Sequence, residues 1–274
     1  MLLAPTRIMM TGSYPLCTKF FSSREEMALT LAVDRHHSLR DSRSEVTELG
    51  SGETTEAFEQ EDEDFKIEGI AGLGANDLND KAFARFLRAF RSVDQAFNAI
   101  LRYLKWRKEF GVDSITVEDS DIKNELRSGK AMLLEHKDNV GRPILLVTAK
   151  LHHSKDRNLQ SLMKFIVYLL ESAGNLCDDD ICDNFCIVFD MKDFSMNSMD
   201  YQFVKNLIWL LSNYYPERLG IWLIINPPVL FSGCWVIIRS WLDENTAKKV
   251  IFVTRPEQLA EYIQPEVLPR NLFL

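Results

Sequence analysis

The sequence predicts an α/β protein in which a small helical subdomain precedes a mixed sheet with helices packed on it. Short β-branched and apolar runs, which suit buried strands, alternate with longer stretches whose apolar residues recur at helical spacing. Such alternation is typical of sheets with parallel strand pairs. Several predicted helices are also apolar on more than one face, which indicates an internal cavity or a bound ligand. The alternative is an unusually hydrophobic but solid core.

Residues 1–75 are predicted to form a disordered acidic tail. Their middle is rich in Ser, Thr, Glu and Asp and has few large apolar side chains to bury. Between Asp41 and Glu68 eleven acidic residues face two basic ones, a net of −9 against −8 for the whole chain. The remainder is nearly neutral, which argues against a nucleic-acid binder with a broad basic field. A protein partner, if the chain acts as a scaffold, is expected to dock on this tail.

Residues 76–128 are predicted to form the helical subdomain. A first helix is expected to be capped near residue 77, and a second to run from Ser92 to Gly111. A third, shorter helix is expected over residues 117–126. These helices have apolar residues at helical spacing and should pack beside the sheet.

Residues 129–270 are predicted to form the mixed-sheet lobe. The expected strands are 131–134, 143–148, 185–189, 219–225 and 250–253. The expected helices are 159–176, 201–215, 229–242 and a short one after Pro256.

The longest apolar run extends from Ile221 to Ile238 and has about the length of a membrane span. Two prolines in its middle would break a lipid-exposed helix, so a buried strand followed by a helix is the better interpretation. That helix, over residues 229–242, is apolar on every side except for two serines and one arginine. It must therefore be covered by protein, by membrane or by a hydrophobic ligand.

No metal site, catalytic site or cofactor is predicted. Cys177, Cys182 and Cys186 lie close together but lack the paired spacings or nearby histidine of a zinc site. There is no Gly-x-Ser-x-Gly or HExxH motif, and the histidine pairs at 36–37 and 152–153 fall in tail or loop contexts, where solvated side chains are expected. Five cysteines without a secretory leader favour reduced thiols in the cytosol. A mitochondrial transit segment at the N-terminus is the alternative to a cytosolic location.

Six motifs occur in order along the chain. They are RFLRA at 85–89, KWRKEFG at 105–111, DNVGRP at 138–143, NYYPERLG at 213–220, IINPP at 224–228 and WLDENTAKKVIFV at 241–253. Together they resemble the CRAL-TRIO domain of lipid-binding and lipid-transfer proteins, and within it the phosphatidylinositol transfer branch. The resemblance spans about residues 76–268, and the NYYPER block is its most specific part. It implies an internal hydrophobic lipid pocket in the mixed-sheet lobe, closed by a mobile gate helix over residues 229–242.

The resemblance also implies a lipid headgroup site. Glu217 and Lys249 match the acid and the base that border the headgroup, and Thr246 matches its hydroxyl donor. An ammonium group neutralises a phosphodiester, a hydroxyl bonds to its oxygens, and a carboxylate accepts hydrogen bonds from inositol hydroxyls. The alternative for these residues is a plain surface salt bridge from Glu217 to Arg218 or to Lys249.

The gate helix is implied to cover acyl chains when closed and to enter the membrane interface when open. Its expected working residues are Val229, Leu230, Phe231, Trp235, Ile238, Trp241 and Leu242. The expected pocket wall consists of Phe185, Ile187 and Phe189.

The chain departs from the family pattern at three positions. Phe90 stands where the family has an arginine after RFLRA, and Phe185 and Ile187 replace the hydroxyl residues that hold a choline-phosphate headgroup. These replacements argue against phosphatidylcholine and leave phosphatidylinositol as the main prediction. An isoprenoid-like or sterol-like hydrophobe is the alternative ligand, and a regulatory or scaffold module is the alternative role. The expected location is the cytoplasm, with peripheral attachment to membranes.

Overall fold

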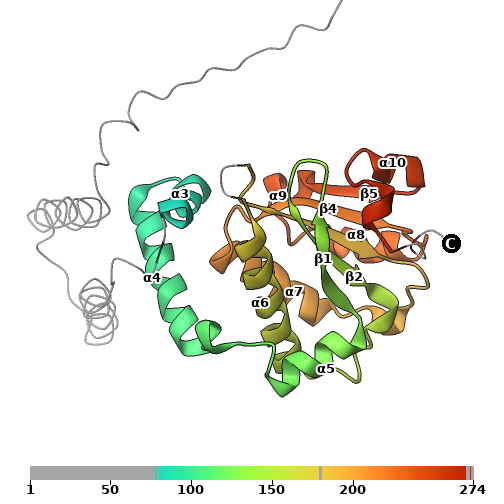
Figure 1. The fold of residues 1–274 in the computed structure, drawn as a ribbon, viewed down its shortest axis with the longest axis horizontal. Coiled ribbons are helices and arrows are strands. Elements are labelled where there is room, and N and C mark those ends of the chain that lie inside the picture. Colours follow the sequence, from blue (N-terminus) through green and yellow to red (C-terminus); the bar gives the residue numbers. More distant parts are fainter. Residues whose placement is uncertain (1–77, 79, 179–180, 270–271, 273–274) are drawn as a thin grey trace, which may run out of the picture. The chain divides into compact units, whose positions relative to one another are not determined.

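The described part of the chain comprises residues 78, 80–178, 181–269 and 272 of a computed structural model. The chain divides into two compact units, Met1–Ala82 and Phe83–Leu274. The predictions for the acidic tail and for a helix cap near residue 77 lie outside the described residues. Figure 1 shows the elements named below.

Three helices precede the sheet. They are α3 (Asp80–Ala89), α4 (Val93–Phe110) and α5 (Ser120–Ser128). The Ser92 side chain caps α4 by accepting a hydrogen bond from the Gln95 backbone N–H, and Gly111 ends it at a φ of 71°. Helix α5 begins three residues later than predicted. The cause is a turn in which Asp119 accepts a hydrogen bond from the Thr116 backbone N–H at 3.0 Å.

The sheet has five strands in the order β1-β2-β3-β4-β5. They are β1 (Ala131–Lys137), β2 (Pro143–Thr148), β3 (Phe185–Asp190), β4 (Leu219–Ile225) and β5 (Val250–Val253). Strands β1 and β2 are antiparallel, and every other neighbouring pair is parallel, which confirms the predicted mixed sheet. Strand β1 is longer than predicted because it continues past a register shift between Leu133 and Lys137.

The helices between the parallel strands cover one face of the sheet. The connecting helices are α6 (Leu159–Leu176), α7 (Tyr201–Tyr214), α8 (Phe231–Arg239) and α9 (Glu244–Lys248), and α10 (Pro256–Ala260) follows β5. Each step from β2 to β5 moves one strand in the same direction, so right-handed connections put α6, α7 and α8 on the same face.

Successive strand residues point to opposite faces, and both faces are buried. On the helix-covered face, Phe185, Ile187, Trp222 and Ile224 pack with α6, α7 and α8. On the other face, the neighbouring strand residues pack against a segment that follows β5 and includes α10. That segment contributes Leu259, Ile263, Leu268 and Leu272. Burial on both sides explains why the parallel strands are continuous apolar runs in the sequence.

The α-helix predicted over residues 229–242 is shorter than predicted at both ends. The α-helical part is α8, and the turns on either side are closed by hydrogen bonds to the third residue back, such as Phe231 N–H to Pro228 O and Leu242 N–H to Arg239 O. The Ser232 and Ser240 hydroxyls each donate to a carbonyl three residues back, at 2.7 Å, which competes with regular helix bonding.

Asn226 fixes the chain just before these turns. Its backbone has a positive φ of 54°, and its side-chain amide donates to Asp190 Oδ1 and to the Leu272 carbonyl oxygen, both at 2.8 Å. The end of β4 is therefore tied to the end of β3 and to the segment on the opposite face of the sheet.

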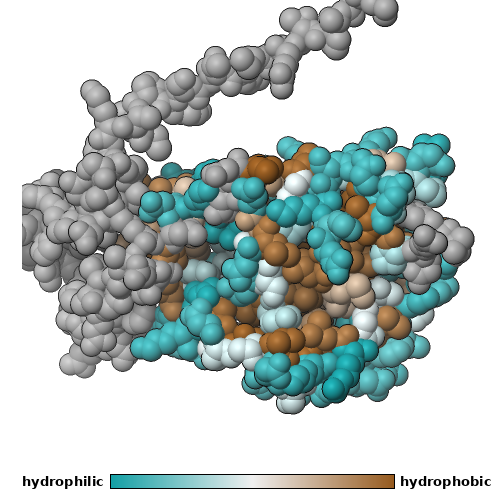
Figure 2. All heavy atoms as spheres, viewed as in Figure 1, coloured by the Kyte–Doolittle hydropathy of each residue, from teal (hydrophilic) through white to brown (hydrophobic). Residues whose placement is uncertain are grey.

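Figure 2 shows hydrophobic atoms gathered in the middle of one face, with hydrophilic side chains around them. Figure 1 draws α6 beside β1 and β2 in this region, and both strands contact α6. The face of the described part seen here is thus apolar at its centre and polar at its rim.

Two glycines provide a matched test of packing. A Cβ on Gly220 of β4 would lie 2.2 Å from Asn184 Oδ1 and 2.7 Å from Arg142 Cδ, whereas a Cβ on Gly233 of α8 would meet nothing within 4 Å. We expect Gly220→Ala to lower the free energy of unfolding by about 1 to 3 kcal/mol through overpacking. Gly233→Ala should raise it by about 0.5 to 1 kcal/mol, since alanine loses less backbone entropy in a helix. Urea unfolding measures both, and equal stability of the two variants would contradict this account.

Candidate functional site

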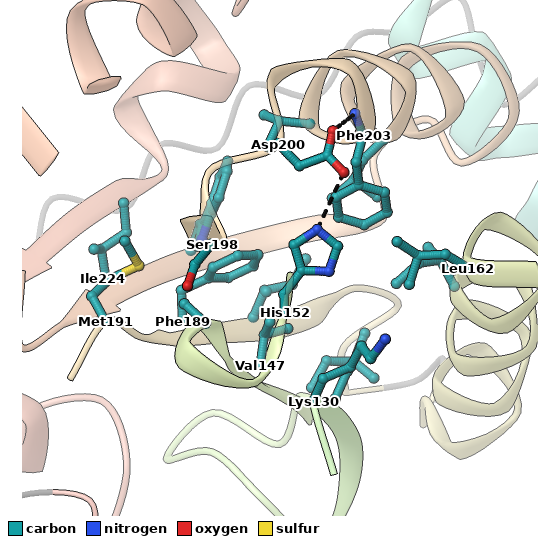
Figure 3. Close-up of a pocket in the computed structure, with 18 of the residues that line it drawn as sticks. Lys130, Val147, His152, Leu162, Phe189, Met191, Ser198, Asp200, Phe203 and Ile224 are labelled. Atoms are coloured by element: carbon teal, nitrogen blue, oxygen red, sulfur yellow. Dashed lines mark hydrogen bonds and ion pairs between the residues drawn. The ribbon is translucent and has the colours of Figure 1, made fainter. Parts of the chain in front are cut away.

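A largely apolar cavity of about 120 Å³ lies between the sheet and helices α6, α7 and α8. Figure 3 shows part of its wall. Its apolar lining includes Phe165, Leu169, Ile187, Phe189, Ile224 and Phe231. The cavity agrees with the expectation, drawn from the surplus of apolar helix faces, that the protein is not a solid core. We call it the apolar cavity.

The three predicted wall residues do not all line this cavity. Ile187 and Phe189 do, and both point from β3 toward the helices. Phe185 is fully buried at the start of β3 and is not among the lining residues. The Arg218 guanidinium carbon lies 5.8 Å from the centre of its ring, so Phe185 supports Arg218 and the core at that end of the strand.

Residues 229–242 have two different apolar faces. The inner side chains are Phe231, Cys234, Ile238 and Leu242, all buried, and Trp235 and Trp241 are partly buried. Of these, Phe231 and Ile238 line the apolar cavity. The outer side chains are Val229, Leu230, Val236 and Ile237, with Val229 91% and Val236 70% exposed. Helix α8 and its flanking turns therefore cover the cavity with one face and present hydrophobic side chains to solvent with the other.

A second cavity of about 220 Å³ adjoins the first and is more polar. Glu217, Thr246 and Lys249 all line it, so the three residues assigned to a headgroup by resemblance come together in one place. Glu217 precedes β4 and Lys249 precedes β5, and neighbouring parallel strands begin at the same edge of the sheet. We call this second space the polar cavity.

The two cavities share part of their walls. Ile187, Phe189, Leu207 and Trp222 line both of them. The Trp222 side chain is buried, and its indole N–H has no hydrogen-bond partner among the described residues. A buried donor without an acceptor is unfavourable, so this position favours a ligand that brings an acceptor atom.

The charged groups of the polar cavity are loosely paired. Lys249 Nζ lies 3.8 Å from Glu217 Oε2, too far for a hydrogen bond. The Thr246 hydroxyl donates to Asp243 Oδ2 at 2.5 Å, and Asp243 also caps α9. Burial alone would raise the pKa of Asp243, but its hydrogen bonds with Thr246 and the helix backbone outweigh burial and lower the pKa.

The alternative to a headgroup site was a surface salt bridge from Glu217 to Arg218 or to Lys249. Of these two pairs, the structure has only the long contact between Glu217 and Lys249. Arg218 instead donates to the Asp183 backbone carbonyl at 2.7 Å. Thr246 is not a free donor, because its proton is directed at Asp243, so a ligand would have to displace that contact or donate to the hydroxyl oxygen.

The turn that presents Glu217 is anchored by a buried hydrogen-bond network. The Tyr215 hydroxyl donates to Glu171 Oε1 at 2.8 Å, and Arg107 of α4 donates to both carboxylate oxygens of Glu171 at 3.1 and 3.0 Å. Burial and the charge of Glu171 raise the pKa of Tyr215 well above its ordinary value, so its hydroxyl keeps its proton. The anchored turn holds Glu217, two residues later, at a positive φ of 59°.

Phe90, the substitution for the family's arginine, is partly buried and stacks on Phe86 with ring centres 6.4 Å apart. Ala89 lines the polar cavity, but Phe90 is not among the lining residues. This position contributes no charge to the cavity.

A second polar group lies in the wall of the apolar cavity, made by Lys130, His152, Ser198 and Asp200. His152 Nε2 lies 3.2 Å from Asp200 Oδ2, as Figure 3 shows, and Arg157 donates to both oxygens of Asp200. Asp200 also caps α7 by accepting from the Phe203 backbone N–H. Lys130 is paired with Glu125 at 2.8 Å.

These contacts set the charges of the group. Burial raises the pKa of Asp200, but the hydrogen bonds from Arg157, the Phe203 N–H and His152 outweigh burial and lower the pKa. Burial lowers the pKa of His152 more than its contact with Asp200 raises it. At neutral pH the pair therefore consists of an ionised carboxylate and a neutral imidazole.

Sequence reasoning missed this second polar group. It predicted a solvated His152, which is wrong, because the side chain is only 12% exposed and is held by Asp200. His153 is exposed, as expected, and His36 and His37 lie outside the described residues. The available signal was position, since His152 follows β2 and Asp200 follows β3, and the carboxyl ends of adjacent parallel strands meet at one edge.

Each of the three clustered cysteines has its own surroundings, although Cys177 and Cys182 both contact Asn184. Cys177 Sγ donates to the Ala173 carbonyl at 3.5 Å, Cys182 Sγ lies 3.2 Å from Asn184 Oδ1, and Cys186 is buried in the sheet. Within the described ranges, no three potential ligands are grouped to hold a metal ion. Among the same residues, no helix combines the length and apolarity needed to cross a membrane.

Comparison with known proteins identifies relatives of the sequence. Residues 126–272 match the model of the CRAL/TRIO domain family. A CRAL-TRIO domain-containing protein of Schizosaccharomyces pombe is 30% identical over 248 residues, which cover 82% of this chain and 55% of that protein. The phosphatidylinositol transfer protein CSR1 of Eremothecium gossypii is 32% identical over 207 residues, which cover 72% of this chain and 47% of that protein. The chain thus matches about half the length of these two relatives.

A solved structure supports the fold. The crystal structure of Sfh5 superposes with a TM-score of 0.56 at 21% sequence identity, over 66% of each chain. At this identity the similarity establishes the α/β architecture alone.

Proposed function

Because this chain belongs to the CRAL/TRIO domain family, we propose that it binds a phospholipid, phosphatidylinositol above all, in the joined cavities and transfers or presents it between membranes. The name of the Eremothecium gossypii relative, a phosphatidylinositol transfer protein, supports this choice of lipid. The proposal includes no chemical step on the lipid.

The observation that carries the proposal is the pairing of a polar cavity with an apolar one. Glu217, Thr246 and Lys249 line the polar cavity, and four residues belong to both walls. A phospholipid has the same two-part character. Its phosphodiester would be neutralised by the Lys249 ammonium, its inositol hydroxyls would donate to Glu217, and its acyl chains would enter the apolar cavity.

Trp222 gives independent support for a glycerophospholipid. Its unpartnered indole N–H belongs to a residue at the junction of the two cavities. The ester carbonyls of a glycerophospholipid lie between headgroup and acyl chains, and a carbonyl oxygen is the acceptor that this donor lacks. A pure hydrocarbon would leave the N–H unpaired.

Helix α8 with its flanking turns, residues 229–242, suits the role of a gate. Its inner face covers the apolar cavity, and its outer face already exposes Val229 and Val236 to solvent. When such a helix opens on a bilayer, its inner side chains leave their contacts with the protein and both faces can contact the membrane interface. The free-energy cost of opening is therefore modest. We accordingly propose peripheral attachment to the cytoplasmic surface of membranes.

A second candidate ligand is an isoprenoid-like or sterol-like hydrophobe. Ile187 favours it, because this apolar residue lines both cavities at a position where the family's phosphatidylcholine binders have a hydroxyl. Competition of a fluorescent phosphatidylinositol against retinoids and tocopherols separates the two candidates. Displacement by these hydrophobes at low concentration would favour the second.

The proposal is tested by Lys249→Ala. We expect loading of phosphatidylinositol from vesicles to fall tenfold or more, since a charged hydrogen bond of about 1.5 to 3 kcal/mol is lost. The free energy of unfolding should change by less than about 1 kcal/mol, since the pair with Glu217 is long and partly exposed. Loading is measured by mass spectrometry of the repurified protein.

The matched control for this test is Lys248→Ala. Lys248 is the preceding residue, is exposed and does not line the polar cavity. The Lys248→Ala variant loses the same charge at the same helix end, so it should load phosphatidylinositol like the wild type. Equal losses in both variants would reduce the effect to general electrostatics, and no uptake by the wild type would refute the proposed function.

A further inference from the structure

Exposed apolar side chains gather at the edge of the sheet where β2, β3 and β4 end. Since these strands are parallel neighbours, the loops that follow them lie at the same edge. Leu151 in the loop after β2 is 42% exposed, Met196 in the loop after β3 is 52% exposed, and Leu230 after β4 is exposed as well. Leu151 and Met196 line neither cavity, so ligand binding does not explain their exposure. We call the loops after β2, β3, β4 and β5 the carboxyl edge, which comprises residues 149–158, 191–200, 226–230 and 254–255.

Hydrogen bonds fix the loops after β2 and β3 to one another. Ser154 N–H and Oγ both donate to the Asn197 carbonyl oxygen, at 3.1 and 3.2 Å. Ser154 follows η2 (Ala149–Leu151), and Asn197 belongs to η3 (Met196–Ser198), so the two short helices are held side by side. The apolar side chains on them are thus presented from a fixed backbone, which lowers the entropic cost of binding a surface.

The carboxyl edge continues directly into the proposed gate. The rings of Phe194, in the loop after β3, and Phe231, the first residue of α8, have centres 5.6 Å apart and meet nearly at right angles. Both residues line the apolar cavity. Val229 and Leu230, which precede Phe231, are exposed. A surface that touches Met196 and Leu230 therefore lies beside the start of the gate and close to the apolar cavity.

The two edges of the sheet differ in charge. The carboxyl edge contains five Lys or Arg against three Asp, a net of +2. The amino edge, defined as the described segments before β2, β3, β4 and β5, contains six acidic residues against four Lys or Arg, a net of −2. Those segments are residues 138–142, 177–178, 181–184, 215–218 and 240–249. An anionic surface is therefore attracted by the carboxyl edge and repelled by the amino edge.

Some cations of the carboxyl edge remain available to such a surface. Two of its three Asp side chains are already paired within the edge, Asp193 with Lys150 and Asp200 with Arg157. Lys155 and Arg255, in contrast, are exposed and form no ion pair with any described residue. Exposed cations beside exposed apolar side chains are the combination that binds a membrane with acidic headgroups.

We propose that the carboxyl edge docks on an anionic phospholipid bilayer. Leu151 and Met196 enter the membrane interface, and the cations of Lys155 and Arg255 meet the acidic headgroups. These anchors lie on fixed loops, so they stay in the membrane whether the gate is closed or open. They hold the start of α8 and the apolar cavity at the bilayer from which lipid is taken. The inference rests on the proposed function, since it takes the ligand to come from a membrane.

A bilayer fits this edge better than a protein partner does. The exposed apolar side chains are few and come from separate loops, whereas a stable protein interface buries about 800 Å² on each partner. Insertion into the membrane interface needs only a small number of apolar side chains with cations beside them. The surface of a bilayer also reaches several loops along one edge at once.

The apolar anchors are tested by Leu151→Asp and Met196→Asp in the full chain. Each is expected to lower binding to vesicles of phosphatidylcholine and phosphatidylserine about tenfold, because an inserted apolar side chain is lost and a repelled carboxylate is added. Co-sedimentation measures the binding. The matched controls are Val140→Asp and Ile181→Asp, whose side chains are 54% and 69% exposed at the amino edge. Both controls should bind like the wild type.

The charge of the carboxyl edge is tested by Lys155→Glu, with Lys248→Glu as the control. Both are exposed lysines, one at the carboxyl edge and one at the amino edge. Lys155→Glu should lower binding to the same vesicles about fivefold or more, the worth of one lysine near an anionic membrane, whereas Lys248→Glu should not lower it. The wild type should in turn bind less when phosphatidylserine is omitted from the vesicles.

Uptake of lipid from solution separates the docking surface from the cavities. Because Leu151 and Met196 line neither cavity, both test variants should load dissolved dioctanoyl phosphatidylinositol like the wild type. Urea unfolding shows independently that the variants are folded. Vesicle binding that depends on Leu151 and Met196, in a wild type that loads no phosphatidylinositol, supports the docking surface and overturns the proposed function. A wild type that loads phosphatidylinositol but does not bind anionic vesicles overturns the docking surface alone.

Further results would also overturn the docking surface. One is equal vesicle binding by the test and control variants, and another is wild-type binding that does not depend on phosphatidylserine. A wild-type dimer that Met196→Asp splits into monomers, with vesicle binding unchanged, would assign the edge to a second copy of the chain instead. Light scattering measures the mass of each variant.

Discussion

Val236→Asp is expected to reduce the binding of the protein to phospholipid vesicles at least tenfold and to reduce lipid transfer in parallel. Val236 is 70% exposed on the outer face of α8, where it contacts solvent in the protein alone. On a membrane, the proposed gate helix inserts this face into the interface, and burying a valine is worth about 1.5 kcal/mol or more. An aspartate loses that gain and adds a carboxylate that anionic headgroups repel.

The measurement is co-sedimentation with vesicles, followed by transfer of labelled phosphatidylinositol between vesicle populations. Val117→Asp is the control, because Val117 is also an exposed valine, 45%, in the turn before α5. It introduces the same charge outside the gate helix and should leave both readings unchanged. The gate assignment is wrong if Val236→Asp binds and transfers like Val117→Asp.

Ile187→Trp is expected to reduce phospholipid loading at least tenfold while the folded state remains nearly as stable. Ile187 lines both cavities, so a lipid with its headgroup beside Lys249 and its chains in the apolar cavity must pass this side chain. An indole at this position fills part of the open volume and narrows the passage. Because the added atoms enter existing space, we expect a loss of unfolding free energy of no more than about 1 kcal/mol, at the low end for overpacked cores.

Val204→Phe separates obstruction of the passage from simple loss of volume. Val204 lines the apolar cavity only, so the larger ring shortens the space for chains but leaves the junction open. This variant should still load dioctanoyl phosphatidylinositol, whereas Ile187→Trp should not. Loading of full-length phospholipid by Ile187→Trp at the wild-type level would show that headgroup and chains do not occupy the two joined cavities.

Helices and strands could be predicted where the sequence contains both a regular pattern of apolar residues and a residue that ends or caps the element. Strand β4 was predicted over its full length, because a run of β-branched residues ends at Asn226 and two prolines. Helix α6 was likewise predicted at both ends, and the Asn158 side chain caps it by accepting from the Gln160 and Ser161 N–H groups. The ends of α8 could not be predicted, since they depend on serine hydroxyls and short-range turns rather than on periodicity.

The candidate site was less accessible to sequence reasoning. Glu217, Thr246 and Lys249 were selected by resemblance to a family, and their grouping depends on β4 and β5 being parallel neighbours. His152 and Asp200 were missed because their contact depends on β2 and β3 being neighbours, which no local pattern specifies. Phe185, Ile187 and Phe189 were named as a pocket wall together with the family resemblance; the structure places Ile187 and Phe189 at the apolar cavity, and the position of Arg218 over the Phe185 ring could not be read from the sequence.

The clamp at Asn226 has a mechanical consequence for the proposed gate. Asn226 is bonded to Asp190 and to the Leu272 carbonyl, and the next two residues are prolines with nearly fixed φ. A swing of α8 would therefore turn about the residues between Asn226 and Phe231, and it would have to break the turn bonds from Phe231 N–H to Pro228 O and from Ser232 N–H to Val229 O. We accordingly expect the proposed gate to open about the short segment before α8, while the bonds of Asn226 keep the end of β4 in place.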